Sequence, residues 1–160
     1  MGGRKLSVFV RLLAGHTEFR SLYYFRIRKG NAQGKLALNI LRIFYRQSPF
    51  LLLDQSTEIG SGFFIQHGLS TVINAESIGE NCWVNQQVTI GYKDETSGRP
   101  KIGDSVYVFA GAKIIGGVTI GNNVKVGANA VVVKDVPDNC TVVGVPARIV
   151  RRNGKRVDEH

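Results

Sequence analysis

The residue in this chain best suited to acid–base chemistry is His67. The sequence holds three histidines, of which His16 lies in a strongly basic N-terminal segment and His160 is the last residue. Imidazole has an unperturbed pKa of about 6.5, so at cellular pH it is largely neutral and can accept a proton from a hydroxyl group. An isolated histidine is more often an ordinary surface residue, so its surroundings must decide between the two interpretations.

A six-residue repeat surrounds His67. An aliphatic residue returns at nearly every sixth position through most of the last hundred residues, at Ile59, Ile65, Val72, Ile78, Val84, Ile90, Ile102, Val108, Ile114, Ile120, Val126 and Val132. A helix would place successive sixth residues about 120° apart, so this period predicts a solenoid instead. The step lengthens to seven between Ile65 and Val72. We expect the extra residue to bulge the coil, which can turn a side chain outward.

Three six-residue segments would close one triangular coil of about 18 residues, so that equivalent residues of successive coils lie about 4.8 Å apart. The repeated Ile and Val residues would stack inside as a core, and glycines would allow corners with positive φ or close backbone approach. We expect Asn122, Asn123 and Asn139 at corners, because Asn tolerates left-handed conformations. Charged and turn-forming residues after Gly91 predict an extruded loop at 92–101, which either closes over a ligand or is merely solvated.

Composition restricts the class of protein. The 160 residues carry a net charge of +9 and are 43% hydrophobic, and no apolar run approaches the roughly eighteen residues needed to cross a bilayer. Cys82 and Cys140 do not have the spacing of metal ligands, so we expect buried thiols in a reducing compartment, no disulfide and no metal. No secretory cleavage pattern follows the N-terminus. The sequence therefore indicates a cytoplasmic protein.

The positive charge is concentrated in the first fifty residues. Residues 1–50 hold ten Lys and Arg residues against Glu18 alone, whereas the rest of the chain is balanced. This segment is rich in Phe and Tyr, and residues 35–47 carry apolar side chains at helical spacing, namely Leu36, Ile40, Leu41 and Phe44. We consider two roles that can hold together, a cap over the open first coil and contact with an anionic membrane surface at the inner membrane face. The lack of a recognised binding motif argues against nucleic acid.

Five segments carry a resemblance to a known family. They are 62–68 (GFFIQHG), 84–91 (VNQQVTIG), 99–103 (RPKIG), 110–116 (AGAKIIG) and 143–150 (VGVPARIV). From residue 60 to residue 150 the chain resembles the hexapeptide-repeat acyltransferases, in particular serine acetyltransferases and the related O-acetyltransferases of surface-polysaccharide synthesis. The resemblance implies an all-β solenoid, a left-handed parallel β-helix, whose handedness departs from the usual right-handed crossover. It also implies a homotrimer with active sites shared between neighbouring subunits.

In the resembling enzymes, the histidine of this motif removes the proton from an acceptor hydroxyl as its oxygen attacks the thioester of acetyl-CoA. The resemblance therefore assigns His67 as general base in direct acetyl transfer, with backbone N–H groups stabilising the oxyanion and no cysteine nucleophile. The expected acceptor-binding residues are Gln66, Gln86, Tyr92 and Arg99. The residues expected to hold acetyl-CoA are Gly91, Ala110, Gly111, Ala112, Lys113, Ala128, Lys134 and Arg148.

The chain departs from the serine acetyltransferase pattern in several respects. The position of the aspartate that orients the histidine is Leu52, and the aspartate directly before the histidine is Gln66. The later Arg-His pair corresponds to Gly98 and Arg99, so a second histidine of the serine site is absent. The large N-terminal helical domain of that family is replaced by the short basic segment.

These departures favour a larger acceptor than serine, a sugar unit of a surface polysaccharide. Two alternatives stay open, which are O-acetylation of L-serine for cysteine synthesis and a non-catalytic β-helical structural module. Asp54 and Glu58 are candidates for the missing carboxylate. The expected organisation is a basic, partly helical segment at 1–53, the β-helix at 54–150 and a flexible tail at 151–160.

Overall fold

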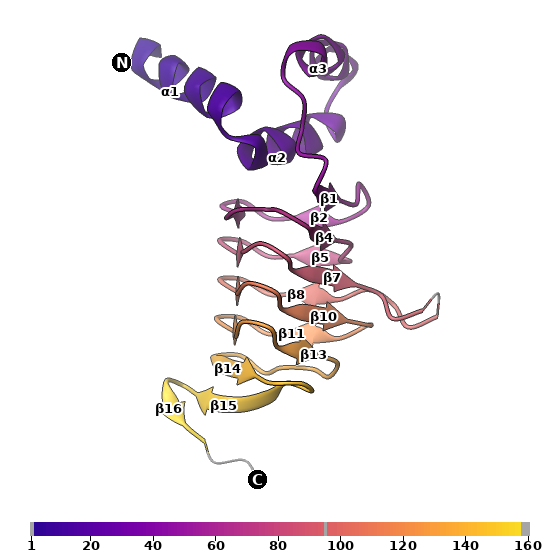
Figure 1. Cartoon of the computed structure of the whole chain (residues 1–160), viewed down its shortest axis with the longest axis vertical. Helices are drawn as coiled ribbons and strands as arrows, with labels where there is room; N and C mark the ends of the chain where they lie inside the picture. Colours follow the sequence, from indigo (N-terminus) through magenta and orange to yellow (C-terminus); the bar gives the residue numbers. More distant parts are fainter. Residues whose placement is uncertain (1, 95, 158–160) are drawn as a thin grey trace. The chain divides into compact units, whose positions relative to one another are not determined.

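The computed structural model describes residues 2–94 and 96–157, with the backbone alone for residues 2–4. The chain divides between Leu51 and Leu52 into two compact units, which we call the helical unit and the solenoid. Figure 1 shows helices along the first part of the chain and short stacked strands along the rest.

The helical unit consists of α1 (Gly2–Gly15), α2 (Thr17–Arg28) and α3 (Ala32–Phe44). The helix predicted within 35–47 corresponds to α3. It begins earlier because the Asn31 side chain accepts a hydrogen bond from the Gly34 N–H at 2.9 Å and caps the first turn. The expectation of a partly helical segment at 1–53 does not locate α1 or α2. The apolar residues of α1 recur at helical spacing much as those of α3 do, whereas α2 has apolar residues on more than one side.

Aromatic residues of α1 and α2 form much of the core of the helical unit. Tyr24 is fully buried, and its hydroxyl donates to the Tyr45 carbonyl at 2.8 Å. The Phe9 ring lies against those of Phe19 and Tyr23, at centroid distances of 6.1 and 5.1 Å. These rings therefore stabilise the helices against one another. No helix in the described ranges is long and apolar enough to cross a membrane.

The solenoid is a left-handed parallel β-helix, as expected. Its strands are β1 (Leu51–Leu53), β2 (Glu58–Ile59), β3 (Phe64–Ile65), β4 (Thr71–Ile73), β5 (Ser77–Ile78), β6 (Trp83–Val84), β7 (Thr89–Gly91), β8 (Lys101–Ile102), β9 (Tyr107–Val108), β10 (Lys113–Ile115), β11 (Thr119–Ile120), β12 (Lys125–Val126), β13 (Val131–Val132), β14 (Cys140–Val143), β15 (Arg148–Arg152) and β16 (Lys155–Arg156). They form three sheets in the orders β1-β4-β7-β10-β13, β11-β8-β5-β2 and β16-β15-β14-β12-β9-β6-β3. Each strand of the coils therefore pairs with its equivalents in the coils before and after it.

The predicted inward residues form the core, except Ile59, which is only half-buried, and Val72. Ile90 pairs with Ile73 on one side and Ile114 on the other, and all three are fully buried. Val72 was expected in this column, but it is 36% exposed and points outward. The reason is that the inward Ile73 follows Ile65 by eight positions instead of six. The next inward residue, Ile78, then follows Ile73 by five positions.

The corners depend on glycine where coils approach each other closely. A Cβ atom on Gly79 would lie 2.7 Å from the Gly103 backbone, and one on Gly60 would lie 2.7 Å from the Gly79 backbone. Asn123 and Asn139 adopt left-handed conformations, with φ of 56° and 58°. Glycine is thus required here by the lack of space, while asparagine accommodates the positive φ.

The loop at 92–100 leaves the stack between β7 and β8 (Figure 1). The sequence places this loop at 92–101, whereas Lys101 already begins β8. The Asp94 carboxylate orders the loop by accepting hydrogen bonds from the N–H and hydroxyl of Thr96, at 3.0 and 2.8 Å. These bonds hold the pKa of Asp94 below its usual value.

The C-terminal segment differs from the flexible tail predicted from residue 151 onward. β15 pairs antiparallel with β14 and with β16, so residues 148–156 fold back on the last coil. Asn153 and Gly154, with φ of 50° and 76°, form the turn. Such a hairpin protects the open edge of the last coil, but its exposed polar residues resemble a loop in sequence. Residues 158–160 of the predicted tail lie outside the described residues.

We expect Gly79→Ala to destabilise the solenoid by about 1–3 kcal/mol, because the added methyl group would overlap the backbone of the next coil. Gly91→Ala is the matched control, since a Cβ atom there meets nothing within 4 Å. We expect this control to change the free energy of unfolding by less than about 0.5 kcal/mol. Urea denaturation followed by circular dichroism measures both. Equal stability of the two variants would contradict a steric role for Gly79.

Candidate active site

Two corners of the solenoid hold most of the predicted site residues. The first, which we call the histidine corner, joins the sheet of β3, β6, β9 and β12 to the sheet of β4, β7, β10 and β13. The second, which we call the loop corner, joins that second sheet to the sheet of β2, β5, β8 and β11, and includes the loop at 92–100. These corners are separate edges of the solenoid.

His67 projects from the histidine corner on a two-residue insertion. The Gln66 N–H donates to the Val84 carbonyl at 2.9 Å, and the Gln87 N–H donates to the Leu69 carbonyl at 2.8 Å. Neighbouring coils are therefore in register before and after His67, with two extra residues between these points, whereas the sequence predicts one. His67 has a φ of 51° and an exposed side chain. The insertion presents the imidazole to solvent at the cost of a left-handed backbone.

Small residues continue the histidine corner along the coils that follow. The Gly111 N–H donates to the Gln86 carbonyl at 3.0 Å, and the Asn129 N–H donates to the Ala110 carbonyl at 2.9 Å. Ala110 and Ala128 therefore occupy places equivalent to Gln86 in the next two coils. Their short side chains leave the backbone of this edge uncovered. We call this surface the small-residue edge; it can receive an extended ligand beside the histidine.

The side chain of Ala112 lies in the core, although the sequence predicts that this residue contacts the cofactor. Its side chain is fully buried. Its N–H donates to the Phe109 carbonyl at 3.2 Å, and its carbonyl accepts from the Thr89 N–H at 3.0 Å. Lys113 is only half-buried, and its Nζ donates to the Gln87 carbonyl at 2.5 Å. The Lys113 ammonium group therefore lies beside the small-residue edge, while Ala112 packs in the core beneath this edge.

Arg99 lies at the loop corner in a polar cluster. Its guanidinium donates to Asn74 Oδ1 at 3.3 Å and to the Ser56 hydroxyl, and it lies 3.9 Å from the Asp54 carboxylate. Asp54 also accepts from the Ser56 N–H at 2.8 Å. Glu58 lies on β2, beyond the same corner. Both carboxylates considered for orienting the histidine thus lie away from the histidine corner of their own chain.

The predicted site residues divide between the two corners. The histidine corner and the strand next to it hold Gln66, His67, Gln86, Ala110, Gly111, Lys113 and Ala128. The loop corner holds Gly91, Tyr92, Arg99 and Lys134, and Arg148 is exposed on β15. A single chain therefore does not bring Tyr92 or Arg99 to the imidazole.

An aromatic groove beside Gln66 has a sequence signal that is easily overlooked. Phe64, Trp83 and Tyr107 each directly precede an inward residue, and their rings form a ladder with centroids 4.7 and 6.0 Å apart. The groove has a volume of about 400 Å³ and is lined by Gln66, Trp83, Asn85, Tyr107, Val108, Phe109 and Lys125. Trp83 Nε1 donates to Gln66 Oε1 at 3.2 Å. The ladder thereby fixes the residue before the histidine.

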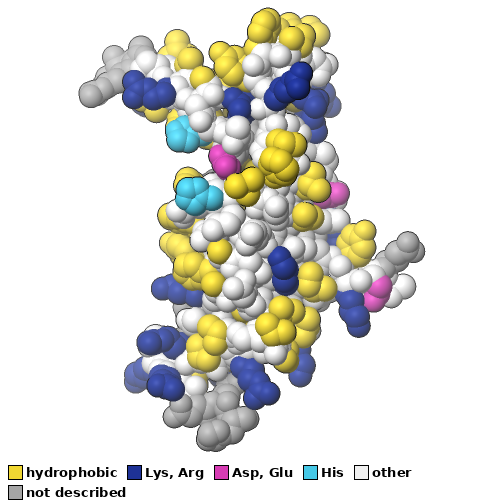
Figure 2. Space-filling view, viewed as in Figure 1, with side chains coloured by type: hydrophobic (Ala, Val, Ile, Leu, Met, Phe, Trp, Pro, Cys, Tyr) yellow, Lys and Arg dark blue, Asp and Glu magenta, His cyan; other side chains and the backbone are white. Residues whose placement is uncertain are grey.

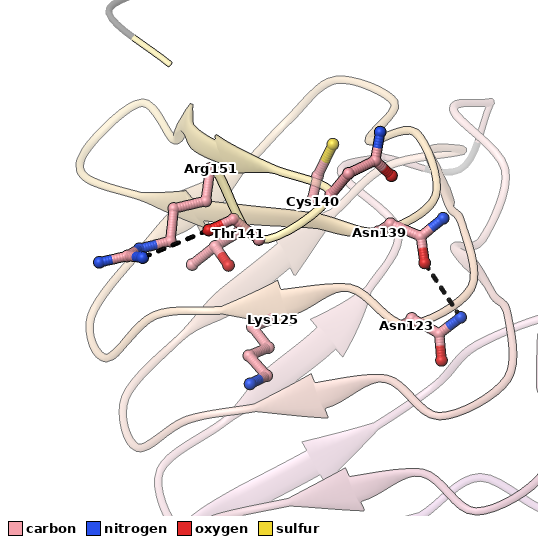
Figure 3. A pocket seen from close by; sticks show the side chains of 8 residues that line it. Asn123, Lys125, Asn139, Cys140, Thr141 and Arg151 are labelled. Carbon is pink, nitrogen blue, oxygen red and sulfur yellow. Dashed lines mark hydrogen bonds between the residues drawn. The ribbon is translucent and has the colours of Figure 1, made fainter. Parts of the chain in front are cut away.

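A second pocket, of about 510 Å³, is lined by cations and amides (Figure 3). Lys125 and Arg151 line it, and Asn123 Nδ2 donates to Asn139 Oδ1 at 3.2 Å. Figure 2 shows that Lys and Arg side chains gather around these C-terminal coils. The two asparagines belong to the third corner of the solenoid, so this pocket is separate from the histidine corner.

The two cysteines are unsuited to nucleophilic chemistry. Both are buried and free. Burial raises the pKa of the Cys82 thiol above its usual value, and the thiol donates to the Gly103 carbonyl at 3.1 Å. A protonated, buried thiol is a poor nucleophile. Within residues 2–94 and 96–157, no group of His, Cys, Asp and Glu side chains could hold a metal ion.

Comparison with known proteins identifies the class. The family model for "Bacterial transferase hexapeptide (six repeats)" matches residues 99–134. Over 156 residues the chain is 35% identical to a serine acetyltransferase of Bacillus pumilus, which covers 94% of this chain and 71% of the relative. The fold and the repeats therefore define a hexapeptide-repeat transferase. The chain belongs to the serine acetyltransferase family.

Two solved structures extend the comparison. A serine acetyltransferase of Neisseria gonorrhoeae in complex with serine is 31% identical, with a TM-score of 0.71 over 89% of this chain and 60% of that chain. A serine acetyltransferase of Brucella abortus in complex with coenzyme A is 28% identical, with a TM-score of 0.68 over 90% of this chain and 60% of that chain. The chain spans from 45% to 71% of the length of the curated relatives it matches.

We expect both cysteines to resist alkylation in the folded protein, because burial keeps each thiol from solvent and the Cys82 thiol protonated. Iodoacetamide treatment at neutral pH, followed by mass spectrometry, should show no added mass until urea is present. The Cys82→Ser/Cys140→Ser variant controls for modification at other residues. Rapid labelling of the native protein, suppressed by acetyl-CoA, would contradict this account and indicate a cysteine at the site.

Proposed function

We propose that the protein transfers the acetyl group of acetyl-CoA to the hydroxyl of L-serine, with His67 as general base. The observation that carries the proposal is the exposed imidazole on its two-residue insertion, at the start of the small-residue edge. L-serine is better supported than the sugar acceptor favoured by the sequence departures, because the relatives and solved neighbours are serine acetyltransferases.

The reaction needs one base and one site for an oxyanion. The His67 imidazole takes the proton of the serine hydroxyl while the serine oxygen bonds to the thioester carbonyl carbon. Backbone N–H groups at the histidine corner stabilise the negative charge that develops on the carbonyl oxygen. The carbon–sulfur bond then breaks, and the departing thiolate takes the proton from the imidazolium. The products are O-acetylserine and coenzyme A, and the protein is regenerated.

Coenzyme A would lie along the small-residue edge. The short side chains of Ala110, Gly111 and Ala128 let the amides of an extended pantetheine arm reach the backbone. Lys113 stands next to this edge, and Arg148 offers an exposed cation on β15 for a phosphate group. Ala112 has no direct role in this arrangement because its side chain is in the core.

The acceptor site would need a second subunit. Tyr92 and Arg99 lie at the loop corner, so His67 lacks them as neighbours within its own chain. In a homotrimer, the loop corner of one subunit can face the histidine corner of the next. Arg99 would then bind the serine carboxylate, because a guanidinium matches the geometry of a carboxylate with two parallel hydrogen bonds.

A sugar acceptor is a second candidate because of the aromatic groove. Trp83 and Tyr107 offer flat ring faces close to Gln66, and the C–H face of a sugar can stack on such rings. Leu52, at the position of the resembling family's orienting aspartate, is 60% exposed and apolar. An imidazole without that carboxylate is compatible with a different acceptor geometry.

We expect His67→Ala to lower kcat by about 100- to 10,000-fold, because the serine hydroxyl then lacks a base. The KM for acetyl-CoA should change little, since the small-residue edge is intact. Release of free thiol in the presence of L-serine measures both constants. His16→Ala is the matched control and should retain full activity. Unchanged turnover in the His67 variant would reject the proposed base.

The same assay distinguishes the acceptors. We expect thiol release with L-serine and none with saccharides that carry free hydroxyl groups. Saccharide-dependent release that falls at least about tenfold in Trp83→Ala would instead support the aromatic groove as a sugar site. Failure of every acceptor in an otherwise folded protein would favour the non-catalytic module.

Mixed oligomers test the shared site. His67→Ala and Arg99→Ala should each be nearly inactive alone. If each site takes His67 from one subunit and Arg99 from its neighbour, random mixing should restore wild-type pairs at about a quarter of the sites. The two variants are unfolded together, refolded and assayed for thiol release. Lack of recovery, with assembly verified by sedimentation, would show that both residues act within one chain.

A further inference from the structure

α3 has an apolar face that no other described part of the helical unit covers. Leu36, Ile40, Ile43 and Phe44 are 66%, 55%, 73% and 74% exposed. Their spacing places them along one side of the helix. The opposite side packs on α2 through Leu38, which is 2% exposed. The exposed side is therefore a second apolar surface, separate from the core of the helical unit.

A basic stripe runs beside this apolar face. Lys35 and Arg42 lie at helical spacing on α3, Arg46 follows just after the helix ends, and all three are exposed. A pocket of about 390 Å³ lies where the stripe meets the apolar face, and it is lined by Asn39, Arg42, Ile43, Arg46 and Gln47. Two guanidinium groups and two amides beside an isoleucine suit a phosphate group attached to an apolar chain.

The charge of this surface is not neutralised from within the helical unit. Glu18 is the single acidic residue in the first fifty, against ten basic ones. Burial, and then the nearby charge of Arg42, lower the pKa of the Arg28 guanidinium. An anion from outside the chain would reduce this repulsion.

We propose that α3 docks on the surface of an anionic lipid bilayer, with its apolar face in the acyl region and Arg42 and Arg46 bound to lipid phosphates. The 13 residues of α3 would span about 20 Å, which is shorter than the hydrocarbon core of about 30 Å. The helix therefore lies in the membrane plane, as amphipathic helices with a basic polar side do. The docking is independent of acetyl transfer.

Two other occupants fit the surface less well. A second copy of α3, packed face to face by two-fold symmetry, would bring two basic stripes together with no acidic partner. Nucleic acid would neutralise the stripe but leave the apolar face exposed to water. A bilayer of anionic lipids satisfies both features at once.

Sedimentation of the full chain with sucrose-loaded vesicles tests the proposal. We expect binding to vesicles of phosphatidylcholine mixed with phosphatidylglycerol to be at least about tenfold tighter than binding to phosphatidylcholine alone. Arg42→Gln/Arg46→Gln should weaken binding to the mixed vesicles by about 25-fold. Ile43→Ser/Phe44→Ser should weaken it by at least about tenfold. Absence of binding by the unaltered protein would overturn the proposal.

A charge-matched control separates docking from general attraction. Arg151→Gln/Arg156→Gln removes two positive charges from the C-terminal hairpin and should reduce binding by less than about threefold. A loss equal to that of the α3 arginine variant would mean that net charge alone drives binding, which overturns the proposal. Excess glycerol phosphate should not compete with the vesicles, because it lacks acyl chains. Full competition would identify a soluble-phosphate site instead.

A spectroscopic variant tests insertion directly without removing an apolar group. Ile43→Trp in a Trp83→Phe background places the single indole on the proposed docking face. Its emission should shift to shorter wavelength on mixed vesicles and be quenched by lipids with brominated acyl chains. An emission that stays unshifted and unquenched on bound protein would overturn the proposal. A lipid-independent change of sedimentation coefficient in Ile43→Ser/Phe44→Ser would also overturn it, since the face would then be a subunit contact.

Discussion

The pairing of each short strand with its equivalents in neighbouring coils is the constraint on which the solenoid depends. A strand of two or three residues has no stability of its own, so it is held by backbone hydrogen bonds to the coils before and after it and by stacked side chains such as Ile73, Ile90 and Ile114. Extra residues inside a strand would break the register of every coil. They can be accommodated only where the chain turns, and both insertions of this chain, at His67 and at 92–100, lie at corners. The stability of the fold therefore restricts inserted residues that can carry chemistry, such as His67 and Arg99, to the corners of the solenoid.

The repeat predicts most of the core but not its local shift. Val72 and Ile73 are both β-branched, so hydrophobicity does not tell which one points inward. The answer depends on the two residues that bulge at His67, and backbone pairing with Ile90 decides it. α2 is harder to predict because its apolar residues lie on more than one side of the helix, and its rings pack against those of another helix, as Tyr23 does against Phe9. The C-terminal hairpin is stabilised mainly by backbone pairing to β14, and its exposed side chains give little hydrophobic signal.

The sequence identifies which kinds of side chain form the candidate site better than it predicts how these side chains are arranged. Counting inward residues assigns each segment to one of three faces, so His67, which follows β3, and Arg99, which precedes β8, could be placed at different corners from the sequence alone. The polar cluster around Arg99 could not, because its contact with Asp54 joins residues far apart in the chain. Ala112 is a different case, since its motif indicates a ligand contact while its side chain, two residues before the inward Ile114, lies in the core. A motif therefore locates an edge of the solenoid, and the strand register decides which of its residues face a ligand.

Charge separates the two units as clearly as their folds do. In the solenoid, basic and acidic residues occur near one another, as in the pairs Lys101 with Glu76 at 3.2 Å and Arg99 with Asp54 at 3.9 Å. Such exposed pairs contribute little stability, but they reduce the long-range field of the unit. The helical unit has Glu18 alone to offset ten cations, and the aromatic residues of α1 and α2 already serve its own core. Salt screens exposed charges beyond about 10 Å, yet a closely spaced group such as Arg28 and Arg42 repels at shorter range. The helical unit thus has a core of its own together with an excess of positive charge and the exposed apolar side chains of α3, two features that a cap over the first coil does not require.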